Sequence, residues 1–108
     1  FYPQYAHKSF VVNFAVTHPD FAALDIALLR DKFRIEKPYF ISPNQFWSHK
    51  NHIVILKAMV AYRASYGALP FQVIFTGKEH DHRDPTYTTR LRDFVQTEQL
   101  DAHVRFLG

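Results

Sequence analysis

The run Phe71–Thr76 (FQVIFT) constrains the fold of this chain more than any other stretch. It is almost continuously apolar and is followed by Gly77. Apolar runs of this kind, without the alternation of a half-exposed strand, are typical of strands covered on both faces in parallel sheets. We therefore look for helices on either side of it, since parallel strands are joined by crossover connections.

The residues before this run predict a strand and then a helix. Tyr39–Ser42 is a short apolar run bounded by prolines, which indicates a buried strand. Asn51–Tyr66 predicts a helix with Gly67 just past its end, and its apolar residues share one face: Ile55, Met59 and Tyr62.

The residues after the run predict a helix and a third strand. Asp84 suits the N-cap and Pro85 the first position of a helix over Pro85–Gln99. Its apolar residues follow the i, i+4, i+7, i+8 spacing: Tyr87, Leu91, Phe94 and Val95. Val104–Leu107 is then expected to form a core strand.

The N-terminal part of the chain predicts one further strand and one further helix. Lys8–Val16 (KSFVVNFAV) is β-branched and aromatic, and predicts a strand. Asp20 can cap a helix over Phe21–Phe33, whose apolar residues lie near helical spacing: Phe21, Leu24, Leu28 and Phe33. We expect residues 1–18 to be an interdomain segment with a strand, and residues 19–108 to be part of one Rossmann-like domain.

The order strand, helix, strand, helix, strand from Tyr39 onward predicts an α/β fold with a parallel sheet and flanking helices. Ligands of such sheets bind beyond the carboxyl ends of the strands. Three segments are expected at that edge: the loops Pro43–Lys50 and Gly77–Asp84, and whatever follows Gly108.

Composition excludes several classes of function. The net charge is +3, and the 13 Lys and Arg residues are scattered, whereas nucleic-acid binding is usually marked by a clustered basic stripe. The chain has no cysteine, which excludes disulfides and thiolate zinc sites. No apolar run reaches the roughly 20 residues that span a bilayer. Because the sequence starts at Phe1 and stops at Gly108, directly after a strand-like run, we expect it to be a piece of a longer protein.

An anion site is predicted at the start of the second helix. A helix that begins at Lys50 or Asn51 presents unpaired N–H groups and a partial positive charge at the ligand edge of the sheet. Lys50 adds a full charge and Gln45 an amide donor. The alternative is that Lys50 is an ordinary surface lysine.

The aromatic and histidine residues of the same loop have less specific roles. Phe46 and Trp47 could stack on a base, but packing is the more common role of aromatic residues. His49 and His52 flank the lysine, where solvation or capping is favoured over phosphate contact.

A metal site is one interpretation of the loop that contains His80, Asp81, His82 and Asp84, because histidines two residues apart can share an ion. No second cluster of ligands accompanies it, so we expect a solvated polar loop and no metal. The Gly-rich fingerprints of dinucleotide-binding and P-loop proteins do not occur in the sequence.

The stretch Gln45–His52 (QFWSHKNH) resembles the opening of the C-terminal domain in family 4 glycosyltransferases of the GT-B type, which have two Rossmann domains. Lys50-Asn51 matches the Lys-Asn variant at the helix start, and Gln45 stands where many members have Arg. FTG at Phe75–Gly77 and VRFLG at Val104–Gly108 resemble the ends of the family's second and third strands. The resemblance covers Phe10–Gly108.

The resemblance implies a transferase that moves a hexose from a nucleotide diphosphate sugar to a glycan or a lipid-linked acceptor, without a metal. It implies that the donor diphosphate is bound by Lys50, Gln45 and Asn51, and that the donor pocket is lined by Asn44, Gly77 and Gly108. The acceptor domain and the family's acidic E-x7-E motif would lie outside this chain. We therefore expect the fragment to be inactive alone and prone to self-association, and the parent enzyme to be cytoplasmic, either free or peripheral to the inner membrane.

Two other interpretations stay open. One is a non-catalytic flavodoxin-like or response-regulator-like binding module, which would need an acidic pocket at the strand ends that Asn44 and Gln45 do not supply. The other is a sugar-nucleotide epimerase of the GT-B type.

Overall fold

The computed structural model describes residues 3–8 and 10–108 of the chain. Three strands, β1 (Tyr39–Pro43), β2 (Gln72–Thr76) and β3 (Val104–Phe106), form one sheet in the order β1-β2-β3, and both pairings are parallel. Helix α2 (His52–Tyr66) connects β1 to β2, and α3 (Tyr87–Thr97) connects β2 to β3. The predicted α/β fold with a Rossmann-like parallel sheet is confirmed.

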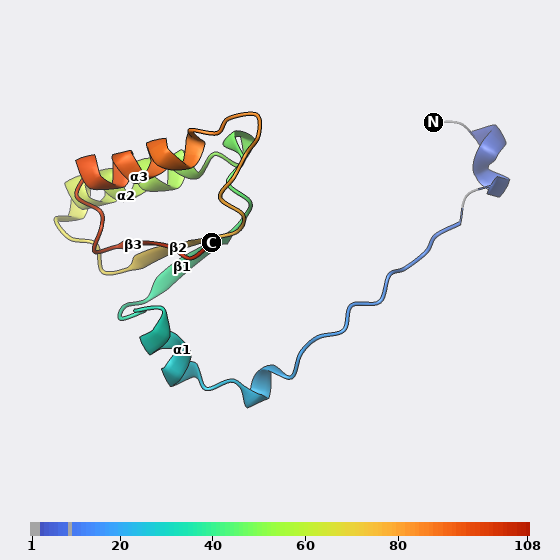
Figure 1. The fold of residues 1–108 in the computed structure, drawn as a ribbon, viewed down its shortest axis with the longest axis horizontal. Helices are drawn as coiled ribbons and strands as arrows, with labels where there is room; N and C mark the ends of the chain where they lie inside the picture. Colours follow the sequence, from blue (N-terminus) through green and yellow to red (C-terminus); the bar gives the residue numbers. More distant parts are fainter. Residues whose placement is uncertain (1–2, 9) are drawn as a thin grey trace.

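The helices cover the two faces of the sheet unequally. Figure 1 shows α2 and α3 together on one face and the shorter α1 (Ile26–Lys32) on the other. The main core lies between the sheet and the pair α2 and α3, and it includes Val73 and Phe75 of β2. α2, the longest of the described helices, has 15 residues. Among the described residues no helix is long and apolar enough to cross a membrane.

Both α2 and α3 bury one face, as predicted, but the buried residues of α2 differ in part from the predicted ones. In α3 the expected residues Tyr87, Leu91 and Val95 are buried. In α2 the buried stripe consists of His52, Leu56 and Met59, while the predicted Ile55 and Tyr62 pack at its margin. Gly67 follows α2 with a φ of 82° and its N–H donates to Arg63 O, as expected of a helix C-terminus.

The prediction that Tyr39–Ser42 is a buried strand is right about the strand and wrong about its burial. Tyr39, Phe40 and Ile41 are 46%, 64% and 56% exposed. The physical reason is position, because β1 lies at the edge of the sheet and is paired only with β2 among the described residues. β2 is the strand covered on both faces, with Gln72 to Phe75 buried.

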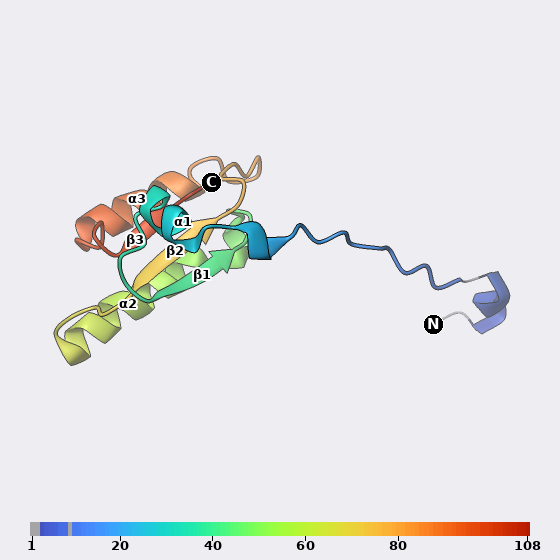
Figure 2. The same cartoon turned by 90° about the horizontal axis from the view of Figure 1, so that it is seen from below.

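The predicted strand Lys8–Val16 is not formed. Lys8 ends a 3-10 helix (Pro3–Lys8), residue 9 lies outside the described residues, and residues 10–20 belong to no regular element. Figures 1 and 2 show this segment leading away from the sheet. The radius of gyration is accordingly 19.2 Å, whereas a compact chain of 100 residues has about 13 Å. A strand needs a hydrogen-bonding partner, and this segment has none among the described residues.

Two predicted helix starts are also wrong. Asp20 caps only a short 3-10 turn (Phe21–Ala23), and α1 begins at Ile26 because Asp25 accepts hydrogen bonds from the amides of Ala27 and Leu28. As a result Phe21, Leu24 and Leu28 are exposed. α3 begins at Tyr87 rather than at Pro85, and the carboxylate of Asp84 binds the guanidinium of Arg90 at 2.6 Å instead of capping the helix.

Buried Gln72 attaches the turn after α1 to the sheet. Its side-chain oxygen accepts hydrogen bonds from the amides of Glu36 at 3.0 Å and Lys37 at 3.3 Å, and its Nε2 donates to Arg34 O at 3.4 Å. The buried polar side chain at the start of β2 therefore holds residues 34–37 in place.

We predict that Gln72→Met destabilises the chain by about 1–3 kcal/mol, because three part-buried hydrogen bonds to the backbone are lost while the side-chain volume is nearly kept. Urea denaturation measures the change, and hydrogen exchange at the amides of Glu36 and Lys37 should accelerate. Gln96→Met on the exposed side of α3 is the control. Equal stability of the two variants would contradict the anchoring role of Gln72.

Candidate functional site

The loops that follow the three strands are joined at the carboxyl edge of the sheet. The amide of Gly77, after β2, donates to the carbonyl of Gly108, after β3, at 3.0 Å. The amide of Phe46, in the loop after β1, donates to the carbonyl of Lys78 at 3.0 Å. The two loops predicted at the ligand edge are therefore connected to each other and to Gly108 by backbone hydrogen bonds.

Gly77 permits the closest of these approaches. Its φ is 132°, and a Cβ built there would lie 2.5 Å from the carbonyl oxygen of Asn44 and 2.7 Å from its carbon. No side chain fits against backbone atoms at that distance. Asn44 and Gly77, both predicted to line a donor pocket, thus pack directly on each other. Gly108 lines a cavity of about 390 Å³ on the α1 side of the sheet, together with Thr76 and Ile74.

The two aromatic residues of the loop after β1 have different environments. Phe46 is fully buried, and its ring stacks on that of His52 with centroids 4.8 Å apart and planes 2° apart. It is a core residue and is not available to stack on a base. Trp47 stays partly exposed, and the guanidinium of Arg83 lies 5.2 Å from the centroid of its ring.

The loop 77–84 is not simply a solvated polar loop, because Asp81 is buried. Its carboxylate accepts hydrogen bonds from the Arg83 amide at 3.0 Å and from Arg83 Nε at 3.1 Å. The hydrogen bond from the Arg83 side chain is the main cause that lowers the pKa of Asp81, and the backbone of Ser48 contributes in the same direction. Asp81 and Arg83 therefore link this loop to Trp47 and Ser48 in the loop after β1.

The remaining polar residues of this loop do not lie together as a set of metal ligands. His80 and His82 are exposed, and Asp84 is paired with Arg90. Within the part of the chain that the structure describes, no three His, Cys, Asp or Glu side chains lie close enough together to hold a metal.

The predicted anion-binding residues lie in one exposed loop, but the helix start differs from the expectation. Ser48–Lys50 forms a 3-10 turn, Asn51 adopts the left-handed conformation with a φ of 53°, and α2 begins at His52. The first amide of the helix is not free, since it donates to the hydroxyl of Tyr87 at 2.9 Å. Gln45, Lys50 and Asn51 are all exposed. Lys50 is therefore an exposed charge at this edge, as is Lys78 in the neighbouring loop, and the first amide of α2 is already hydrogen-bonded.

His52 is a buried imidazole beside this charge. Burial is the main cause that lowers its pKa, and the positive charge of Lys50 lowers it further, while the backbone of Asn44 acts in the opposite direction. Its Nδ1 lies 3.4 Å from the Tyr87 hydroxyl, and its Nε2 has no hydrogen-bond partner of good geometry. The surroundings thus favour the neutral form of His52 over the charged form.

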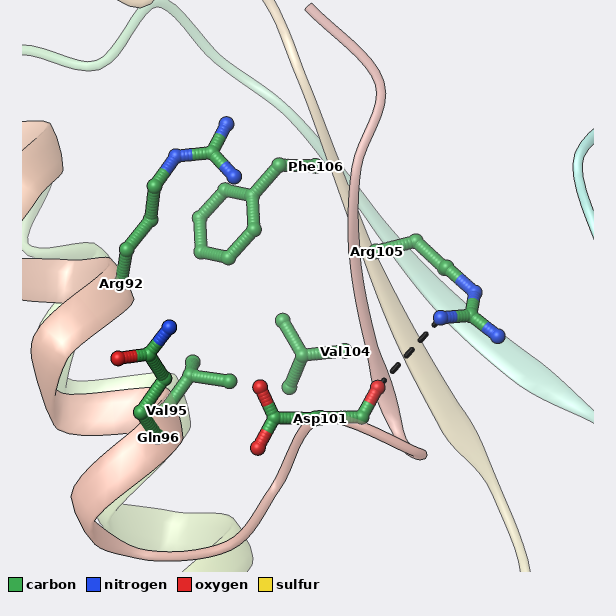
Figure 3. Close-up of a pocket in the computed structure, with 7 residues that line it drawn as sticks. All are labelled: Arg92, Val95, Gln96, Asp101, Val104, Arg105 and Phe106. Atoms are coloured by element: carbon green, nitrogen blue, oxygen red, sulfur yellow. Dashed lines mark hydrogen bonds between the residues drawn. The ribbon is translucent and has the colours of Figure 1, made fainter.

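A separate cavity of about 360 Å³ opens between α3 and β3 (Figure 3). Val104 and Phe106 point toward α3, whereas Arg105 points to the other side of the strand. Arg92 lies over the ring of Phe106 at 4.4 Å and binds both carboxylate oxygens of Glu79 at 2.8 Å. None of the predicted donor-binding residues lines this cavity.

We predict that Gly77→Ala destabilises the chain more than Gly67→Ala. Both glycines have positive φ, so both substitutions carry a backbone cost of about 1 kcal/mol or more. At Gly67 a Cβ meets no atom within 4 Å, whereas at Gly77 it collides with Asn44. Urea denaturation compares the two variants, and the fluorescence of Trp47, the single tryptophan of the chain, reports on loop displacement. Equal losses with unchanged fluorescence would show that the approach of Asn44 is not important.

We also predict a pH dependence from His52. Because its pKa is lowered in the folded chain, the unfolded chain binds a proton that the folded chain does not. Stability is then complete above the ordinary histidine value of about 6.5 and falls as the pH decreases below it. Thermal or urea unfolding from pH 7.5 to 5 should give a shallower pH slope for His52→Gln than for the original chain. His82→Gln, at an exposed histidine, is the control and should keep the original slope; identical slopes in all three proteins would contradict the prediction.

No family model, curated protein or solved structure matches this chain. The structure by itself establishes an α/β fold with a three-stranded parallel sheet, interleaved helices and three connected loops at the carboxyl edge. What binds at that edge is inferred from its chemistry.

Proposed function

We propose that this chain is the donor-binding part of a nucleotide-sugar-dependent glycosyltransferase of the GT-B type, and that the carboxyl edge of its sheet binds the donor diphosphate. The observation that carries the proposal is the joining of all three strand-end loops beside an exposed lysine. In parallel α/β sheets this edge is the usual place for ligands.

The charge of Lys50 supports an anionic ligand. Among the described residues, the four salt bridges are formed by arginines, and Lys50 is in none of them. The nearby carboxylate of Asp81 is neutralised by Arg83, so it does not cancel the lysine. The ammonium group of Lys50 forms no salt bridge with a described residue and lies beside the hydrogen-bonded loops of the carboxyl edge. Such a charge suits a phosphate group.

The chemistry of the reaction uses the same arrangement. When the bond between the sugar and the diphosphate breaks, negative charge grows on the departing diphosphate. A cation and amide donors that are already in position stabilise that charge without reorganisation. We assign the cation to Lys50 and the amide donors to the side chains of Gln45 and Asn51. Asn44, Gly77 and Gly108 would form the wall of the donor pocket, with Gly77 keeping the two loops close.

A flavodoxin-like or response-regulator-like module is less well supported. Such a module of the acidic type needs free carboxylates at the strand ends. Here Asn44 and Gln45 are neutral, and Asp81 is buried and paired with Arg83. The proposal therefore favours an anionic ligand over a cation.

We predict that Lys50→Ala weakens the binding of a nucleoside diphosphate by about ten- to a hundredfold. A charge-assisted hydrogen bond contributes roughly 1.5–3 kcal/mol, and each 1.4 kcal/mol is a factor of ten. Isothermal titration with UDP and GDP measures the affinity, and inorganic diphosphate in a parallel titration isolates the contribution of the phosphates.

Lys57→Ala is the matched control, because Lys57 is an exposed lysine further along α2. It should leave the affinity unchanged. If the original chain binds none of the three ligands, or if the two lysine variants bind equally well, the proposed diphosphate site is wrong.

A further inference from the structure

The open edge of β1 is an apolar surface that the domain leaves unpaired. β1 pairs with β2 on one side and with no described residue on the other. Its first three side chains are large and apolar, and Tyr39, Phe40 and Ile41 are 46–64% exposed. A strand edge of this kind presents free N–H and C=O groups and serves as a template for another strand.

Apolar walls lie along this edge on both faces of the sheet. On the α2 side a cavity of about 210 Å³ is lined by Phe40 together with Met59, Tyr62 and other apolar residues. On the α1 side the cavity of about 390 Å³ reaches Tyr39 and Ile41 and is bounded by Leu29 and Phe33 of α1. Apolar side chains therefore reach β1 on both faces of the sheet, and a strand added beside β1 would extend both apolar faces.

One segment of the chain has the composition of such a strand and lacks a partner. Phe10–Val16 (FVVNFAV) has large apolar side chains that are 60–92% exposed. In an extended conformation one face would carry Phe10, Val12, Phe14 and Val16, and the other the smaller set Val11, Asn13 and Ala15. Both faces suit apolar walls, which explains why the sequence predicts a strand that the structure of one chain does not contain.

We infer that the open edge of β1 binds the Phe10–Val16 segment of a second copy of this chain. The segment leads away from its own sheet in both views (Figures 1 and 2). Parallel addition to its own β1 would use α1 as the crossover helix. Because α1 lies on the face opposite to α2 and α3, that crossover would be left-handed, and about 98% of such connections are right-handed. A second copy is not subject to this constraint.

Exchange of the Phe10–Val16 segment between two copies covers the open β1 edge of each copy. Each chain donates one segment and accepts one, which closes a two-fold symmetric dimer with the same contact made twice. This inference does not depend on the proposed diphosphate site, which lies at the carboxyl edge of the sheet.

The oligomeric state tests the inference. Light scattering coupled to size-exclusion chromatography should give twice the 12.7 kDa of a single chain. Val12→Pro, which removes a ladder donor from the segment, should give monomers, and so should Phe40→Lys, which places a charge on the β1 edge. Thr89→Lys, at an exposed residue of α3 that lines neither cavity, should leave the dimer intact.

Mixing the two monomeric variants gives the decisive result. Val12→Pro retains a normal β1 edge and Phe40→Lys retains a normal segment, so together they should form a one-to-one heterodimer that neither forms alone. A peptide with the sequence of Phe10–Val16 between flanking lysines should dissociate the original dimer, which tests the same contact without any variant.

Three results would overturn the inference: a monomeric original chain, a dimer that survives both substitutions, or a mixture that stays monomeric while the peptide has no effect. A monomer that Val12→Pro destabilises would instead assign the segment to the β1 edge of its own chain.

Discussion

Most of this structure depends on the burial of β2 on both faces. Its two edges pair with β1 and β3, so it fixes the order of the sheet. Val73 and Phe75 face the core under α2 and α3, while Ile74 faces the α1 side. Gln72 at its start holds the turn after α1, and Gly77 just past its end allows the loop after β1 to approach. A five-residue strand thus connects every layer of the domain and the candidate site.

The carboxyl edge combines rigid packing with an unpaired charge. Phe46 inserts into the core and stacks on His52, and Asp81 and Arg83 hold Trp47 from the neighbouring loop. These contacts fix the backbone between β1 and α2, and they leave Lys50 at the surface. In the proposed function, this fixed backbone is what presents Lys50 to the donor diphosphate.

The two sides of β1 show how unevenly the domain is covered. α2 and α3 cover the main core on one face of the sheet, whereas α1 on the other face is short and is anchored through Gln72. An apolar cavity lies beside β1 on each face. The exposed segment Phe10–Val16 has the complementary character. Apolar surface is costly to leave in water, so an open edge and an unpaired strand-forming segment in one chain favour association.

The sequence by itself determined the three strands of the sheet and the helices between them, along the chain from Tyr39 onward. The apolar run of β2, the helical spacing in α3 and the glycine after α2 are local patterns, and local patterns suffice to predict strands, helices and their ends. The alternation of those elements then predicted a parallel sheet, and with it the edge where Asn44, Lys50, Gly77 and Gly108 lie.

Only the tertiary structure decided which residues are buried and which polar groups find partners. It placed Tyr39 to Ile41 at an exposed edge, put Phe46 in the core and Trp47 outside it, and buried Asp81. It also brought the Tyr87 hydroxyl to the first amide of α2, across 35 residues of sequence. The physical reason is that burial and hydrogen bonding depend on residues distant in the chain, and the pattern of any one segment does not contain them.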